Sequence, residues 1–131
     1  MGAEDTQRSA KVLVVDDEPG VLSVLAHFLR GEVSVCTASS AEEALRILRG
    51  GLPINIVISD YGLPGMDGFE FLGVVQREFL GVGRILMSGQ RKPENIGQIP
   101  FLAKPAARAE VLGTVKEMLG QIAEGKDRSP C

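Results

Sequence analysis

Short apolar segments alternate with longer segments of helical periodicity along the chain, and this alternation restricts the fold more than any other feature. Residues 12–15 are apolar throughout and mostly β-branched, which is typical of a strand buried on both faces. Pro19 then opens a segment with apolar side chains at helical spacing, which Gly31 ends. The same alternation continues downstream. It predicts an α/β fold in which a parallel sheet carries helices on both of its faces.

The expected boundaries follow from the same patterns. Strands are predicted at 12–15, 33–37, 54–58, 85–87 and 101–103, and helices at 19–30, 67–79, 107–123 and between Ser40 and Gly50. Ser40 and Glu43 have the spacing of a capping box, and Asp67 is expected to cap the third helix. On one side of that third helix lie Phe69, Leu72, Val75 and Phe79.

The composition is that of one globular domain. Of the 131 residues, 44% are hydrophobic and 24% are charged, and the formal net charge is -3. This charge argues against nucleic-acid binding, and the apolar runs are far shorter than the ~20 residues of a membrane span. Cys36 and Cys131 do not form a disulfide framework, so a reduced, cytoplasmic setting is expected. We expect one domain at 11–123 between flexible tails at 1–10 and 124–131.

Chemically distinctive side chains follow four of the predicted strands. The first strand is followed by Asp16 and Asp17, and the third ends at Asp60. Ser88-Gly89 follows the fourth strand, and Lys104-Pro105 follows the fifth. Because the carboxyl ends of parallel strands meet at one edge of the sheet, we expect three carboxylates, a hydroxyl and an ammonium to converge there.

Three carboxylates at one edge repel each other, and this repulsion points to a cation. At ~5 Å and an effective dielectric constant of ~20, each pair costs roughly 3 kcal/mol, more than one lysine can offset. Mg2+ prefers such oxygen ligands and usually binds phosphate oxygens as well. The cluster therefore predicts phosphoryl chemistry in which a carboxylate forms an aspartyl-phosphate. Ser88 and the backbone N–H groups of Gly62 and Gly89 are candidate donors to the phosphoryl oxygens.

Each candidate residue also has an ordinary structural interpretation. Asp16 and Asp17 could cap the first helix, although a cap needs only one acid. Asp60 alone would be interpreted as a turn residue before the glycine and proline that follow it. Lys104 alone would be a solvated lysine, and Phe101 at least partly a core residue. The combination at four strand ends is what favours the chemical interpretation.

Taken together, these motifs make the chain similar to the receiver domains of bacterial two-component response regulators. The resemblance covers about residues 11–123 and implies a flavodoxin-like sheet of five parallel strands in the order 2-1-3-4-5. The motifs that carry it are Val14-Val15-Asp16-Asp17-Glu18, Asp60-Tyr61-Gly62-Leu63-Pro64-Gly65-Met66-Asp67-Gly68, Met87-Ser88-Gly89 and Phe101-Leu102-Ala103-Lys104-Pro105.

The resemblance implies a phosphoacceptor and a metal site. Asp60 would accept a phosphoryl group from a phosphohistidine of a sensor histidine kinase or a histidine phosphotransfer domain. Asp16 and Asp17 would hold Mg2+ together with Asp60 and the backbone carbonyl of Gly62. Lys104 would pair with the phosphoryl group or with the free Asp60.

The resemblance also implies a conformational switch rather than an enzyme. Ser88 would be the switch hydroxyl, Phe101 the switch aromatic, and Pro105 would follow a cis peptide bond. The phosphoryl group would favour one loop arrangement, which a downstream protein target detects, and self-catalysed hydrolysis would reset it. The implied protein is a cytoplasmic monomer or weak dimer that binds neither nucleic acid nor membrane.

The sequence departs from the family pattern between Ser88 and Lys104, which are 16 positions apart. Related receivers have room there for a full helix, whereas residues 90–100 contain two prolines and allow at most one or two helical turns, starting near Pro93. This short segment keeps open a binding module that signals without phosphate. An Asp-based phosphatase would want an acid where Gly62 stands. The chain could be a stand-alone regulator or a domain of a larger protein such as a hybrid kinase.

Overall fold

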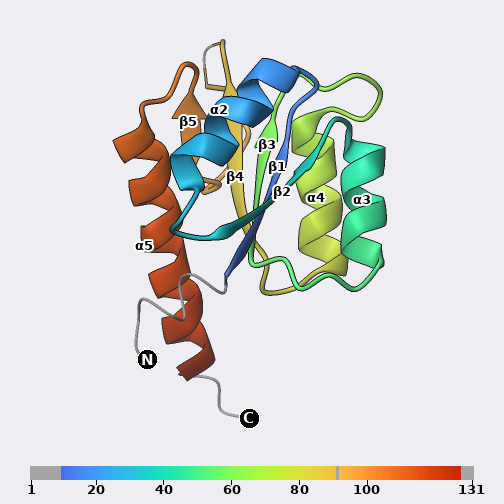
Figure 1. Ribbon diagram of the computed structural model, residues 1–131. Helices are drawn as coiled ribbons and strands as arrows, with labels where there is room; N and C mark the ends of the chain where they lie inside the picture. Colours follow the sequence, from blue (N-terminus) through green and yellow to red (C-terminus); the bar gives the residue numbers. More distant parts are fainter. Residues whose placement is uncertain (1–9, 91, 128–131) are drawn as a thin grey trace.

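The computed structural model describes residues 10–90 and 92–127, with side chains to residue 122. Strands and helices alternate as the sequence predicts (Figure 1). In chain order the elements are β1 (Lys11–Val15), α2 (Pro19–Leu29), β2 (Ser34–Ala38), α3 (Ala41–Arg49), β3 (Ile56–Asp60), α4 (Gly68–Glu78), β4 (Gly83–Ser88), β5 (Phe101–Ala103) and α5 (Arg108–Asp127).

The five strands form one parallel sheet in the order β2-β1-β3-β4-β5, which confirms the predicted topology. The register pairs Asp60 at the end of β3 with Met87 on β4, and Ser88 at the end of β4 with Ala103 on β5. The strands therefore end almost level with one another. This alignment brings the residues that follow β1, β3, β4 and β5 to one edge of the sheet.

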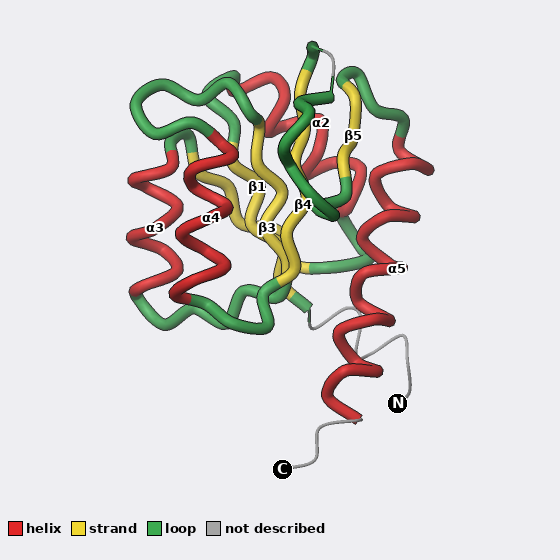
Figure 2. Tube along the Cα trace, turned by 180° about the vertical axis from the view of Figure 1, so that it is seen from behind, coloured by secondary structure: helices red, strands yellow, loops and turns green. Residues whose placement is uncertain are grey.

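The sheet separates two apolar cores. Helices α2 and α5 cover one face, and α3 and α4 cover the other (Figures 1 and 2). Successive residues of β1 alternate between them: Val12 and Val14 pack toward α2 and α5, and Leu13 and Val15 pack toward α3 and α4. All four are fully buried, and each such side chain contributes about 1.5–3 kcal/mol of burial free energy. This two-sided burial explains the uninterrupted apolar sequence of the strand.

The hydrogen bonds at the starts of α3 and α4 agree only in part with the predicted caps. Asp67 caps α4 as expected, because its carboxylate accepts from Glu70 N at 2.8 Å and the Glu70 carboxylate accepts from Asp67 N. At α3 the Ser40 hydroxyl accepts from Glu43 N, as predicted. The Glu43 carboxylate, however, accepts from the backbone and hydroxyl of Ser39 instead of from Ser40. The predicted box is therefore wrong in its second half, since Ser39 offers two donors.

The prediction of which side chains form the buried side of α4 is wrong for one residue, Phe69. Phe69 is 38% exposed, whereas Phe71 is fully buried. The helix starts at Gly68, and its buried positions are 68, 71, 72 and 75, spaced three and four residues apart. Phe69 lies away from that side, so the two neighbouring phenylalanines have different environments.

The chain ends differ slightly from the expected boundaries. Helix α5 continues to Asp127, four residues beyond the predicted end. Ala10, which we assigned to the N-terminal tail, is buried, and its carbonyl accepts from Ser34 N at 2.9 Å. The rest of the predicted tails, residues 1–9 and 128–131, lies outside the described residues. No helix in the described part of the chain is long and apolar enough to cross a membrane.

The connection between β4 and β5 contains turns but no helix in its described residues, 89–90 and 92–100. This agrees with the prediction that at most one or two helical turns fit between Ser88 and Lys104. Pro93 and Pro100 lack a backbone donor, and Gly97 has a φ of 65°, which is not a helical conformation. Figure 2 shows this connection as a loop beside β4 and β5. Within the loop, the side chain of Ile96 is buried.

Candidate functional site

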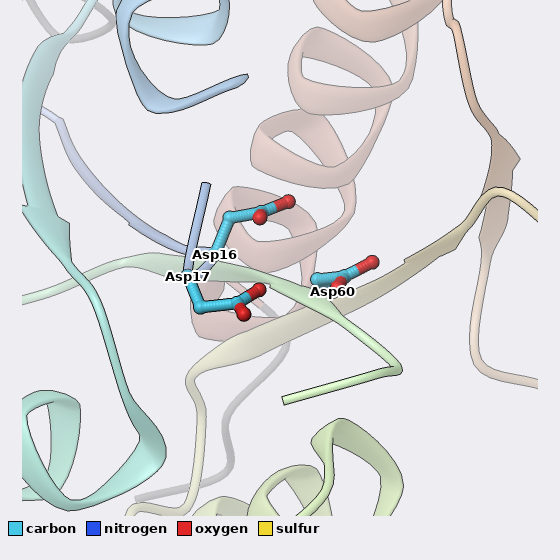
Figure 3. Close-up of side chains that lie close together, drawn as sticks. All are labelled: Asp16, Asp17 and Asp60. Atoms are coloured by element: carbon cyan, nitrogen blue, oxygen red, sulfur yellow. The ribbon is translucent and has the colours of Figure 1, made fainter. Parts of the chain in front are cut away.

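Three aspartates converge at the carboxyl edge of the sheet, as predicted (Figure 3). Asp16 follows β1 and is fully buried, Asp60 ends β3 and is 7% exposed, and Asp17 is exposed. One carboxylate oxygen from each residue lies within 4.8 Å of the others. The parallel topology accounts for this convergence, because β1 and β3 are neighbours in the sheet although Asp16 and Asp60 are far apart in the sequence.

Lys104 brings the positive charge of the site. Its Nζ lies 2.8 Å from Asp16 Oδ2 and 2.9 Å from Asp60 Oδ1. Its backbone N–H donates to the Ser88 carbonyl at 2.9 Å, which fixes the lysine at the end of β5. The Lys104–Pro105 peptide bond is cis, as the sequence motif implied.

Glu18 is a fourth acid near the site, and it belongs to one of the sequence motifs but was assigned no role in the site. Its Oε1 lies 3.7 Å from the Lys104 Nζ, and its side chain is largely exposed. Its backbone N–H donates to Asp16 Oδ1 at 2.9 Å, which helps to orient the buried carboxylate. The signal in the sequence was the run of three consecutive acids after β1.

The remaining predicted site residues lie around this group. Ser88 is buried at the end of β4, and its Oγ accepts from Gln90 N at 3.0 Å. A Cβ placed on Gly62 would lie 3.8 Å from Asp60 Oδ2, so the backbone there borders the acid. Gly89 is exposed beside Ser88, with open space around its Cα. Phe101 is half-buried and packs against the core on the side of α3 and α4.

Burial and charge act in opposite directions on the two central groups. Burial raises the pKa of the Asp60 carboxyl and the Asp16 charge adds to this, while the hydrogen bond from Lys104 opposes it; the net shift is upward. Burial disfavours the Lys104 ammonium, but its hydrogen bonds to Asp16 and Asp60 outweigh this and raise the pKa of Lys104. The upward shift of the Asp60 pKa is therefore caused mainly by burial, which the hydrogen bond from Lys104 offsets only in part.

The acidic cluster fits a hard divalent cation. Its donors are carboxylate oxygens, which Mg2+ prefers. The Oδ2 atom of Asp16 is buried, and the Lys104 ammonium at 2.8 Å is its one close partner among the described residues. The donor set of this protein is therefore suited to Mg2+.

The raised pKa of Asp60 predicts how the stability of the metal-free protein depends on pH. The folded state holds the Asp60 proton more tightly than the unfolded chain, whose carboxyl titrates near 3.8. The contribution of Asp60 to the free energy of unfolding therefore falls as the pH rises from the unfolded pKa through the folded one. We expect urea unfolding in EDTA to show this fall as a pH-dependent difference between wild type and Asp60→Asn. A difference that stays constant from about pH 4 to about pH 7 would contradict it.

The fold and the site together define a class of protein: a doubly wound α/β domain with an acidic cluster and a lysine at the carboxyl edge of its sheet. The family model for the response regulator receiver domain matches residues 12–116. The chain belongs to this family and is a receiver domain of two-component signal transduction. Receiver domains are phosphoacceptor switches that take phosphoryl groups from histidine kinases.

Curated relatives support the assignment. The chain is 34% identical over 119 residues to the hydrogenase transcriptional regulatory protein HoxA of Cupriavidus necator, covering 86% of this chain and 24% of that protein. It is 31% identical over 129 residues to the transcriptional regulatory protein GlrR of Escherichia coli K12, covering 93% and 29%. The two-component response regulator ORR6 of rice is 34% identical over 119 residues, covering 82% and 70%. The chain thus spans about a quarter of the first two relatives.

Solved structures show the same fold. The signal receiver domain of an HD domain-containing protein from Pseudomonas fluorescens Pf-5 superposes with a TM-score of 0.83 at 27% identity, covering 89% of this chain and 99% of that one. The chemotaxis response regulator CheY4 of Vibrio cholerae superposes with a TM-score of 0.76 at 28% identity, covering 84% and 98%.

Proposed function

We propose that this receiver domain takes a phosphoryl group onto the Asp60 carboxylate from a phosphohistidine of a sensor histidine kinase or a histidine phosphotransfer domain. The observation that carries the proposal is the shared ion pair: Lys104 bridges Asp60 and Asp16 at 2.9 and 2.8 Å. A carboxylate held beside an ammonium and a metal-suited cluster can act as a nucleophile toward phosphorus.

The metal site belongs to the same proposal. Asp16, Asp17 and Asp60, with the backbone carbonyl of Gly62, would hold Mg2+. When bound, the ion neutralises charge on the carboxylates and on the phosphoryl oxygens.

The transfer forms a bond between a carboxylate oxygen of Asp60 and phosphorus while the bond between phosphorus and the donor's imidazole nitrogen breaks. The imidazole keeps the electron pair and takes up a proton. Lys104 holds Asp60 in place before transfer and can pair with phosphoryl oxygens afterwards. The Ser88 hydroxyl accepts from Gln90 N, which leaves its own proton free for a phosphoryl oxygen. The backbone N–H groups of Gly62 and Gly89 are further donors.

Phosphorylation acts as a population shift. The phosphoryl group gains its contacts with Ser88 and Lys104 in one arrangement of the loops, so it favours that arrangement. Phe101 lies three residues before Lys104 on the short strand β5 and would change rotamer with the loop. Water attack on phosphorus releases phosphate and restores the Asp60 carboxylate, which resets the domain.

An apolar groove beside the site is suited to the docking of the donor protein. It has a volume of about 560 Å3 and runs between the start of α2 and the loop that follows β5. Val24, Phe28 and Ala106 line it next to Lys104, and Val24 is 50% exposed. A small-molecule donor needs no such surface, whereas a helix that carries a phosphohistidine can bury apolar side chains there.

The test is phosphorylation of the full chain by acetyl phosphate. With Mg2+ present, we expect the intact mass to rise by about 80 Da, and EDTA to prevent the gain. Circular dichroism in the same buffers shows that the protein stays folded. A folded protein that gains no mass with Mg2+ would reject the proposal and favour the binding module that signals without phosphate.

A further inference from the structure

The connection from β4 to β5 leaves part of the sheet without a covering helix. The three preceding connections each contribute one helix, α2, α3 or α4, whereas the described residues between β4 and β5 form turns. On the face that carries α3 and α4, α4 reaches as far as β4, and the described part of this connection covers the sheet beside β5 with a loop instead of a helix. In Figure 2 this loop runs between α4 and α5.

A groove of about 1130 Å3 lies at this position. Its walls come from α4, from residues 81–84 and 95–100, and from residues 118–122 of α5. No residue of the edge strand β5 lines it, so an added strand would not use this surface. Its lining along α4 runs from Phe69 to Arg77, which corresponds to ~12 Å or a little more than two helical turns.

Several apolar side chains that line the groove are partly exposed. Phe69 is 38% exposed at its α4 wall. Val74, Val82 and Ile99 are partly buried, and they also belong to the outer layer of the core on the α3 and α4 side. These side chains form a surface that a second apolar element could complete.

The groove also carries two guanidinium groups that form no close ion pair among the described residues. Arg77 and Arg84 line it, and neither has a described carboxylate within 4.0 Å. Arg77 is still near enough to Glu78 to help lower the pKa of that carboxyl, so Arg84 is the more clearly uncompensated charge. Arg84 Nη1 makes only long contacts of 3.5 Å with the Leu72 carbonyl and the Gln76 carboxamide. Burial lowers the pKa of Arg84, as expected for a partly desolvated cation without an acid beside it. The acid in the groove wall, Glu70, accepts from Asp67 N in the capping box.

We propose that this groove binds an amphipathic helix of a partner protein that carries acidic side chains beside its apolar face. The helix would take the place that a helix between β4 and β5 would fill, with its apolar side on Phe69, Val74 and Ile99. Its acidic side chains would pair with Arg77 and Arg84. The groove shares no residue with the group of Asp16, Asp17, Asp60, Ser88 and Lys104, so it is an interaction site beyond the proposed phosphoacceptor function.

The test measures binding of two synthetic peptides to the full chain. Both are three-turn helices with leucines at positions i, i+3, i+4 and i+7; one has flanking glutamates and the other has lysines in their place. We expect the glutamate peptide to bind roughly tenfold more tightly, because it alone can pair with the arginines. Amide resonances of Gly73, Gly81 and Gly97, which line the groove, should shift on binding.

Three variants test whether the peptide binds in the groove. A Cβ on Gly73 would contact only the Arg77 guanidinium, at 3.6 Å, so α4 can accept a larger residue there. Gly73→Trp fills the groove and should abolish binding, while the matched Gly73→Ala should keep it. Arg84→Met should reduce the difference between the two peptides. The acetyl phosphate reaction serves as the control for an intact fold.

Several results would overturn the proposal. They are the failure of both peptides to bind, equal affinity of the unsubstituted protein for the two, and binding that survives Gly73→Trp. Sedimentation velocity tests a different occupant: a dimer that Gly73→Trp dissociates would assign the groove to a second copy of this chain and would also reject the partner helix.

Discussion

Gly68→Ala is expected to lower the free energy of unfolding by about 3 kcal/mol, the upper end of the usual cost of overpacking. A Cβ at this position would overlap the Asp60 carbonyl oxygen, and it would lie 2.8 Å from the carbonyl carbon and 2.9 Å from Tyr61 Cα. These are backbone atoms at the end of a buried strand, so they cannot rotate away as a side chain can. For a chain of this length the midpoint of thermal unfolding should fall by roughly 10–15 °C.

The matched control is Gly113→Ala in α5. Gly113 is exposed, and a Cβ there would meet nothing within 4 Å. This change should leave stability unchanged or raise it by up to ~1 kcal/mol, because alanine is the better helix former. Thermal and urea unfolding measure both variants. If Gly68→Ala stays within ~0.5 kcal/mol of wild type, the close approach of α4 to Asp60 is not as described.

Asp60→Asn is expected to abolish phosphoryl uptake from acetyl phosphate while the fold is retained. Asparagine has nearly the same shape, but its amide nitrogen replaces the oxygen that would attack phosphorus. Lys104 keeps its contact with Asp16 at 2.8 Å, so the strand end should stay in place. Intact mass spectrometry with Mg2+ should show no gain of about 80 Da.

The control for this variant is Asp67→Asn in the connection that follows β3. Asp67 caps α4, and asparagine caps helices about as well as aspartate does. The variant should therefore be phosphorylated like wild type. If Asp60→Asn gained the adduct, or if both variants lost it, Asp60 could not be assigned as the acceptor.

The sequence predicted the fold and most of the site because both depend on local patterns. The uninterrupted apolar strands indicated a sheet covered on both faces, and the parallel order then required the strand ends to meet. Asp16, Asp60 and Lys104 were therefore brought together by topology before any distance was known. Charge repulsion between the carboxylates supplied the argument for a metal ion.

Some features could not be predicted because they depend on contacts between residues far apart in the sequence, or on a choice between two neighbouring residues of the same type. Glu18 approaches Lys104 only because β1 and β5 end at the same edge. Phe69 and Phe71 are equally apolar, and the exact helix start decides which is buried. Ser39 and Ser40 are chemically alike, and local geometry decides which one the Glu43 carboxylate accepts from. The short connection after β4 was predicted, but the groove beside α4 also depends on how α4, this loop and α5 pack against one another.

The most direct test of the central claim is to locate the phosphoryl group in the wild-type protein. After reaction with acetyl phosphate and Mg2+, borohydride reduces an aspartyl-phosphate to homoserine, which peptide mass spectrometry can assign to one position. We predict homoserine at residue 60 and at no other aspartate. Modification at Asp16 or Asp17 instead, or a stable phosphate on Ser88, would contradict the account.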